Sequence, residues 1–179
     1  MVSGGLGLLF VGLLGNWLPI IIYVFFWIFF FGFFEIRVLC SHCPYYAEEG
    51  RILHCLANHG TIKLWSFHPE PMNTYEKLGF LSGALFFVVF PVIIEIWGLY
   101  QLWTDIRQIT LNVLILGAFA VLSTIGGGYF FVFLRRNICP TCVNFSCPFN
   151  SVPKEIVDAY LKKNPIMREA WEKTGYQLD

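Results

Sequence analysis

Three long stretches of the sequence carry almost no charged side chain, and each is long enough to cross a lipid bilayer. They cover about Trp17–Phe34, Leu78–Tyr100 and Ile109–Leu134. A helix that spans the hydrocarbon core needs about 20 apolar residues. Apolar residues make up 56% of the chain and aromatic residues 18%, which is too much for an ordinary soluble domain. The sequence therefore predicts a small α-helical integral membrane protein with three transmembrane helices.

The first apolar stretch is longer than one span. Asn16 is the one strongly polar side chain in Leu6–Phe34, and a single helix over that range would be about 43 Å long. We therefore expect a break at residues 16–19, where Asn16 can cap a helix and Pro19 suits its first turn. Residues 6–15 then either lie at the outer membrane interface or form a short separate helix.

The spans divide the chain into four parts. These are residues 1–34, the outer N-terminus and first transmembrane helix; 35–77, a Cys/His-containing loop; 78–134, a transmembrane helical hairpin; and 135–179, a Cys-containing tail. Three spans put the loop and the tail on the same side of the membrane. All of the 12 Lys and Arg residues except Arg107 lie in these two segments or at their edges. The positive-inside rule therefore predicts an inner-membrane protein with its N-terminus outside and both cysteine segments in the cytosol.

Each polar segment begins with an arginine and a C-x-x-C motif. The first reads Arg37-Val38-Leu39-Cys40-Ser41-His42-Cys43 and the second reads Arg136-Asn137-Ile138-Cys139-Pro140-Thr141-Cys142. In a reducing compartment this spacing favours metal or redox chemistry over structural disulfides. Because the motifs follow parallel helices at matched positions, they predict one tetrahedral site shared by their four thiolates. Cys55 and Cys147 follow at unequal spacings, so they complete either a second site or an asymmetric one.

Two short resemblances bear on the metal. Pro140 in C-P-x-C resembles the knuckles of zinc ribbons and rubredoxins, which implies a structural zinc site. Cys147-Pro148, after Cys139-x-x-Cys142, resembles the way bacterial ferredoxin motifs end in Cys-Pro, which implies an iron–sulfur cluster. Zinc is the favoured cofactor and an iron–sulfur cluster is the alternative. A thiol-redox or metal-relay role and unligated buried thiols remain as further interpretations.

The loop also contains local signals of secondary structure. Residues 51–56 and 61–65 alternate in polarity on either side of the turn at residues 58–60, which predicts a short β-hairpin of the kind that follows a knuckle in zinc ribbons. Asn73 and Glu76 have the spacing of a capping box at the start of the second span. The four histidines of the chain are candidate substitutes for a missing sulfur ligand, although a structural role is favoured for each: His42, His54, His59 and His68.

The tail predicts two amphipathic helices. Ser151 is expected to cap the first, and Asn164-Pro165 to end it and start the second. Their charges are balanced, so we expect them to pack over the metal-binding loops; the alternative is that they lie on lipid headgroups or hold a partner. Trp97, Tyr100 and Trp103 predict an aromatic belt before a tight outer loop at residues 104–108.

Few polar side chains lie within the spans. Glu95 is about five residues from the outer belt, and we expect it to reach the interface. Because no charged residue lies near the midplane, a transport path is weakly supported. The glycines of Gly79-x-x-x-Gly83 and Gly126-Gly127-Gly128 are expected to serve close helix packing.

The sequence contains none of the motifs of phosphate-binding loops, catalytic triads or H-E-x-x-H metalloproteases, so it predicts no catalytic activity of its own. The expected function is that of a metal-stabilised adaptor or accessory subunit of a membrane complex. Its expected partners are the lipid bilayer and one or more membrane protein subunits, and no nucleic acid. An electron-transfer subunit with an iron–sulfur cluster is the competing class.

Overall fold

The computed structural model describes residues 2–55, 60–104 and 109–179. Within these ranges the chain is helical and has no named strand. Three helical stretches are long and apolar enough to span a membrane, as predicted: Leu18–His42, Thr74–Trp103 and Leu111–Thr141. The chain forms two compact units, which we call the apolar unit (Met1–Phe29 and Ser82–Val132) and the cysteine unit (Phe30–Leu81 and Phe133–Asp179).

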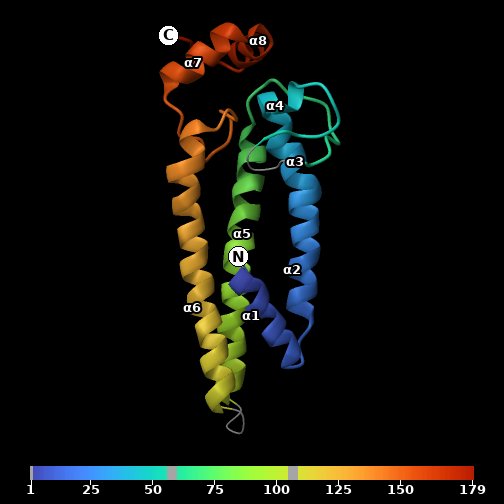
Figure 1. The fold of residues 1–179 in the computed structure, drawn as a ribbon, viewed down its shortest axis with the longest axis vertical. Coiled ribbons are helices and arrows are strands. Elements are labelled where there is room, and N and C mark those ends of the chain that lie inside the picture. Colours follow the sequence, from blue (N-terminus) through green and yellow to red (C-terminus); the bar gives the residue numbers. More distant parts are fainter. Residues whose placement is uncertain (1, 56–59, 105–108) are drawn as a thin grey trace. The chain divides into compact units, whose positions relative to one another are not determined.

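The apolar unit contains a short helix and parts of three long ones (Figure 1). Its helices are α1 (Val2–Leu13), α2 (Leu18–Phe29), most of α5 (Thr74–Thr104) and nearly all of α6 (Ile109–Phe133). Many of their large apolar side chains are exposed, for example Phe25 at 73% and Leu114 at 70%. Exposed apolar side chains all along a helix are what lipid contact requires, because the bilayer core solvates them.

The predicted break before the first span is present. Gly15 has φ +109, a left-handed conformation that suits glycine, and the chain turns there from α1 into α2. Pro19 lies in the first turn of α2, as expected. Because α2 begins at Leu18, Trp17 rather than Asn16 occupies the position before the helix. Residues 6–13 therefore belong to a short separate helix, one of the two predicted alternatives, and residues 14 and 15 form the turn after it.

Glycines bring α1 close to α5 and α6. A Cβ atom on Gly4 would lie 3.0 Å from Cβ of Pro91, and Val11 is buried in a cluster with Leu102 and Leu116. Since Pro91 and Ser123, the neighbours of Gly4, lie in the middle of α5 and α6, the N-terminal end of α1 reaches only part of the way along these helices (Figure 1). α1 is thus a half-length helix that covers one stretch of the bundle.

Pro91 explains a polar contact inside the apolar unit. A proline within a helix has no N–H, so the carbonyl four residues earlier loses its helical partner. That carbonyl belongs to Phe87, and Tyr23 Oη of α2 donates a hydrogen bond to it at 3.1 Å. The Tyr23 ring also stacks on Phe87 and Phe90, with centroids 5.5 and 6.1 Å away. This pair of contacts fixes α2 to α5.

Glu95 does not reach the interface as the sequence predicted. Its side chain is 0% exposed, and Ser123 Oγ of α6 donates a hydrogen bond to Oε1 at 3.0 Å. The prediction considered α5 alone, whereas α1 lies over this position. Gly7 of α1 is so close that an added Cβ would come within 1.9 Å of Oε1.

The cysteine unit has two small hydrophobic clusters. The first joins Ile36, Cys40, Tyr46 and Leu53. The second belongs to the tail helices α7 (Lys154–Lys163) and α8 (Pro165–Lys173), and joins Val157, Leu161, Met167 and Trp171. Phe67 of the loop packs against both clusters. The tail helices therefore pack on the loop, as the sequence predicted, although the apolar side chain of Ile156 in α7 is exposed.

The predicted β-hairpin is wrong. Ile52 and Ile62 form one isolated antiparallel bridge, and Leu53 N–H donates to the carbonyl of Thr61 at 2.8 Å. The pairing then shifts by one residue, because the carbonyl of Leu53 accepts from Gly60 (2.9 Å) and not from Thr61. Gly60 has φ +88, which is typical of a bulge. Two strands without a third are marginal in water, and here Leu53 is buried against helical residues instead. Residues 58 and 59 of the expected turn lie outside the described residues.

The predicted helix ends have mixed outcomes. The capping box at α5 is confirmed: Asn73 N–H donates to Glu76 Oε2 and Glu76 N–H donates to Asn73 Oδ1, both at 2.9 Å. Asn164 is also confirmed, since its side chain accepts from Met167 N–H at the start of α8. Ser151 as a cap is wrong, because α7 begins at Lys154 after Pro153. The outer loop expected at residues 104–108 lies almost wholly outside the described residues.

Candidate metal centre

The two C-x-x-C motifs have the same backbone conformation. Each forms a single turn of 3₁₀-helix, η2 (Cys40–His42) and η5 (Cys139–Thr141). The residue before each turn has φ −106, and the residue after it, Cys43 or Cys142, is extended. Side chains three residues apart eclipse one another on a 3₁₀ turn, and in the first motif Cys40 and Cys43 line the same cavity, whereas in the second only Cys142 lines it. The repeat in the sequence is therefore a repeat in backbone conformation.

The structure brings five of the six predicted ligand residues to one cavity. The cavity has a volume of about 120 Å³. Cysteines from both polar segments line it: Cys40, Cys43, Cys55, Cys142 and Cys147. Cys139 is outside this lining, but it is close enough to Cys142 and Cys147 to interact with them electrostatically. None of the six cysteines forms a disulfide bond with another.

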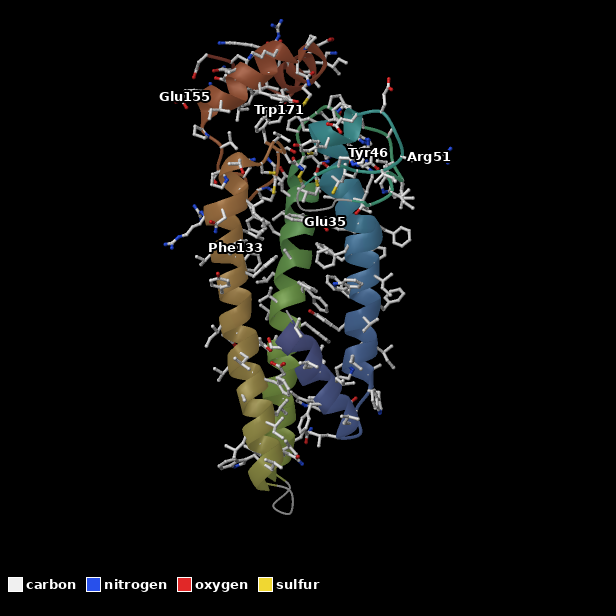
Figure 2. All side chains as sticks on the ribbon, viewed as in Figure 1. Glu35, Tyr46, Arg51, Phe133, Glu155 and Trp171 are labelled. Carbon is white, nitrogen blue, oxygen red and sulfur yellow. The ribbon has the colours of Figure 1, made fainter. Side chains whose placement is uncertain are left out.

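The rest of the cavity wall is mainly apolar. Leu39, Leu53, Ile138 and Val143 contribute side chains to it, together with the single carboxylate of Glu35. Glu35 follows the π-helical segment η1 (Phe30–Phe34) in the four-residue helix α3 (Glu35–Val38), and is labelled in Figure 2. Glu35 was not predicted as a site residue, because in the sequence it only marks the start of the loop directly after the first span. A sulfur-rich cavity with apolar walls has a low dielectric, which strengthens any bond between a thiolate and a cation.

Burial dominates the protonation of these thiols. It raises the pKa of Cys43 and of Cys147 to about 12, and it also raises the pKa of Cys142. Neighbouring thiols add to the effect, since Cys142 and Cys55 both disfavour a negative charge on Cys43. Without a cation Cys43, Cys142 and Cys147 stay protonated at neutral pH. A bound cation reverses this balance, because it stabilises the thiolates.

Backbone amides act in the opposite direction. Three of the thiols accept a hydrogen bond from the N–H two residues further along the chain, which lowers their pKa values against the effect of burial: Cys43 from Tyr45, Cys142 from Asn144 and Cys147 from Phe149. Such bonds stabilise a sulfur atom that carries negative charge. The loops are therefore arranged so that three sulfurs from two distant segments already have donors for their anionic form.

Asn144 and Asn150 hold the second loop in place. Asn144 Nδ2 donates to the carbonyl of Leu39 at 2.8 Å, and these two residues are 105 positions apart in the chain. Asn150 Nδ2 donates to the carbonyls of Cys142 and Asn144, at 2.8 and 3.0 Å. Asn144 is buried and also accepts from Ser146 Oγ. Neither asparagine was predicted to support the site, because nothing in their spacing indicates the carbonyls to which they donate.

The histidine of the first motif has a structural environment. His42 is buried, its Nδ1–H donates to the carbonyl of Glu70 at 2.6 Å, and its Nε2 lies 3.4 Å from Glu76 Oε2. Glu76 Oε1 also lies 3.7 Å from Nη1 of Arg37, the arginine that precedes the motif. His68 Nδ1–H donates to the carbonyl of Ser66, and its ring is 5.6 Å from that of His42. His42 therefore supports the loop from outside the sulfur cavity; His59 lies outside the described residues.

The cysteines gather without converging on a point. In the described part of the chain, no three His, Cys, Asp or Glu side chains are close enough together to hold one metal ion. Comparisons of the chain with protein-family models, with curated proteins and with solved structures found no match. Inferences about function therefore depend on the cavity and the residues around it.

Proposed function

We propose that the protein is a small integral membrane protein whose cysteines hold a metal centre, and that it acts as an adaptor or accessory subunit of a membrane complex. One observation carries this proposal: five thiols from two segments about a hundred residues apart line a single cavity. Unligated buried thiols need no such gathering. A metal centre in that cavity would join the loop after the first span to the tail after the third.

Zinc is the first candidate cofactor, with Cys40, Cys43, Cys139 and Cys142 as its core ligands. Four thiolates suit a closed, tetrahedral structural site. The free energy of structural zinc binding, about 10–16 kcal/mol in zinc-finger peptides, contributes directly to folding. The hydrophobic clusters described in the cysteine unit are small, so the free energy of zinc binding would compensate for its limited apolar burial. Since the thiols lie around the cavity, zinc binding would draw the two motifs inward.

An iron–sulfur cluster in an electron-transfer subunit is the second candidate, and the size of the cavity favours it. A water molecule needs about 10–15 Å³ by the same measure, so the volume of about 120 Å³ far exceeds one ion. Five lining thiols also exceed the four that one zinc takes. The N–H donors to sulfur and the apolar walls are features that set the potential of such clusters.

Metal analysis of anaerobically purified protein, combined with its visible absorption spectrum, tests both candidates. Stoichiometric zinc without a visible band supports the adaptor. A brown protein with iron and acid-labile sulfide supports electron transfer. Protein that contains neither metal and still has six titratable thiols would contradict both.

The proposed membrane orientation has its own test. Three spans put the loop and the tail on one side, and the positive-inside rule assigns this side to the cytosol. In intact cells a membrane-impermeant maleimide should then label Arg107→Cys but not Lys63→Cys or Lys173→Cys. The reverse pattern would invert the orientation and remove the reducing compartment on which metal ligation by free thiols depends.

A further inference from the structure

Glu95 is a buried acid that the proposed metal centre does not use. Its carboxyl group lies between α1, α5 and α6 in the apolar unit and is 0% exposed. Oε1 accepts a hydrogen bond from Ser123 Oγ at 3.0 Å, and Oε2 is buried without a hydrogen-bond partner. An ionised carboxylate in such a place requires a cation or several donors.

The helices around Glu95 supply no cation in the described residues. α1 has no titratable side chain, and α6 has no acidic or basic one. In α5, the remainder of the part that lies in the apolar unit, residues 82–104, contains no second charged residue in its described range. α2 contributes Tyr23, a titratable group close enough to interact with Glu95 electrostatically. A single hydroxyl donor from Ser123 does not replace the hydration of a carboxylate, so the neutral acid is the stable form here.

The chain is shaped for close contact between this acid and α1. An added Cβ on Gly7 would lie 1.9 Å from Oε1 and 2.6 Å from Cδ of Glu95, so glycine is required for α1 to cover the carboxyl group. Gly5, two residues away on the same helix, has nothing within 4 Å of an added Cβ. The close contact with the carboxyl group is therefore specific to the face of α1 that carries Gly7.

Hydroxyl groups continue from the acid toward the middle of the bundle. Ser123 and Tyr23 both line a small cavity of about 10 Å³, which is also bounded by Gly4 and Pro91. This volume is close to the smallest that admits one water molecule, about 10–15 Å³. Two hydroxyls and a space of that size provide hydrogen-bond donors and acceptors close to Glu95.

We propose that Glu95 is a proton-binding site: a carboxylic acid, neutral while α1 covers it, that exchanges its proton with water when α1 moves away. On release the O–H bond of the carboxyl group breaks, the proton passes to water, and the remaining carboxylate keeps the hydrogen bond from Ser123. Binding reverses these steps. A glutamine would fill the same space and accept the same hydrogen bond, but it could not carry a proton.

Infrared spectroscopy of the full-length protein in lipid nanodiscs tests this proposal. The expected result is a C=O band of a protonated carboxyl group that is lost in Glu95→Gln, shifts in deuterated buffer, and loses intensity as the pH rises. If Glu95→Gln does not accumulate, Ser123→Ala assigns the band, since the lost donor changes its frequency. A band that is missing at every pH, or one that never titrates while the protein stays folded, would overturn the proposal.

Two further comparisons sharpen the test. Gly7→Leu should displace α1 and accelerate deuterium exchange of the acid, whereas Gly5→Leu should leave the rate unchanged. Equal rates in the two variants would exclude α1 as the cover. Titrations in sodium and in choline buffers should agree, because the ligand is a proton. A midpoint that depends on sodium would assign the site to that cation instead and overturn the proposal.

Discussion

The two units of this chain bury their side chains in different ways. In the apolar unit, α1, α5 and α6 meet through glycines, as at Gly4 and Gly127, while large apolar side chains remain exposed on the outside. In the described part of the cysteine unit the apolar clusters are small, and five thiols line one cavity beside the hydrogen bond from Asn144 to Leu39. Close backbone packing suits helices in lipid, where there is little hydrophobic drive between them.

This difference indicates what stabilises each unit. The apolar unit is held by direct helix contacts, so its stability should respond to the size of residues at those contacts. The cysteine unit is a small domain with few buried apolar residues, so it should depend on whatever its thiols bind. Substitutions in the two units should therefore destabilise the protein in different ways, and those that remove metal ligands should have the largest effect.

The largest effect should come from the thiols. Cys43→Ser combined with Cys142→Ser removes one cavity-lining ligand from each motif, and should abolish metal binding. The lost binding energy, about 10–16 kcal/mol for structural zinc, is comparable to the whole stability of a domain, about 5–15 kcal/mol. Limited proteolysis should then cut the loop and the tail while the apolar helices stay intact. Chelator-treated wild type is the control and should show the same cleavage pattern. Normal metal content and protease resistance in the variant would show that the cysteine unit does not depend on metal binding by these thiols.

A smaller effect should come from the tail helices. Leu161 is 0% exposed in the cluster of α7 and α8, whereas Ile156 on the same helix is 57% exposed. Leu161→Ala should cost about 2–5 kcal/mol through the cavity that it leaves, and Ile156→Ala less than about 0.5 kcal/mol. Hydrogen exchange of the tail measures both changes. If Ile156→Ala were equally damaging, the exposed side of α7 would be covered by a partner or by lipid.

In the apolar unit the matched pair is Gly127 and Gly128. An added Cβ on Gly127 would lie 2.4 Å from Val88 Cγ1, while one on Gly128 has nothing within 4 Å. Gly127→Leu should therefore force α6 away from α5 and cost about 1–3 kcal/mol, as overpacking does. Thermal unfolding in detergent measures this change. Gly128→Leu should leave the chain's stability nearly unchanged, and a loss of assembly in that variant alone would indicate a second subunit on this face.

Much of this architecture could be predicted because it depends on local patterns. Hydropathy alone predicts three helices long and apolar enough to span a membrane. Spacing predicts a shared site of Cys40, Cys43, Cys139 and Cys142, and three of these four residues, all but Cys139, line one cavity. The capping box at Asn73 is also local, since its two hydrogen bonds join residues three apart. In each case the residues that decide the structure are close together in the sequence.

The features that were missed depend on contacts between distant segments. The cover over Glu95 comes from Gly7, and nothing in the glycine-rich N-terminal stretch indicates which helix it meets. The hydrogen bond from Asn144 to Leu39 likewise joins two segments whose proximity follows only from the fold. The hairpin failed for the opposite reason: its local alternation was real, but the burial of Leu53 against helical residues ended the pairing after one bridge.

The smallest predicted effect concerns pH, and it contrasts the buried acids of the two units. Glu95 in the apolar unit has no cationic partner among the described residues. The buried Asp158 of α7 instead accepts hydrogen bonds from Lys154 Nζ at 2.7 Å, Tyr176 Oη at 2.9 Å and Asp179 N–H at 3.3 Å. The Lys154 hydrogen bond, followed by that of Tyr176, lowers the pKa of Asp158 below its usual value. In the unfolded chain an aspartate has a pKa of about 3.9.

A carboxylate whose pKa is lower in the folded state stabilises that state above its unfolded pKa and loses this contribution as the pH falls through its folded pKa. The tail should therefore keep its protection from hydrogen exchange down to about pH 4 and lose part of it at lower pH. Asp158→Asn should lower protection at neutral pH and flatten this acid dependence, while Glu155→Gln, on an exposed side of the same helix, should leave both unchanged. If Asp158→Asn loses as much protection from hydrogen exchange in acid as the wild type does, another group controls the loss. The contrast between Asp158, which is paired with Lys154, and Glu95 would then not hold.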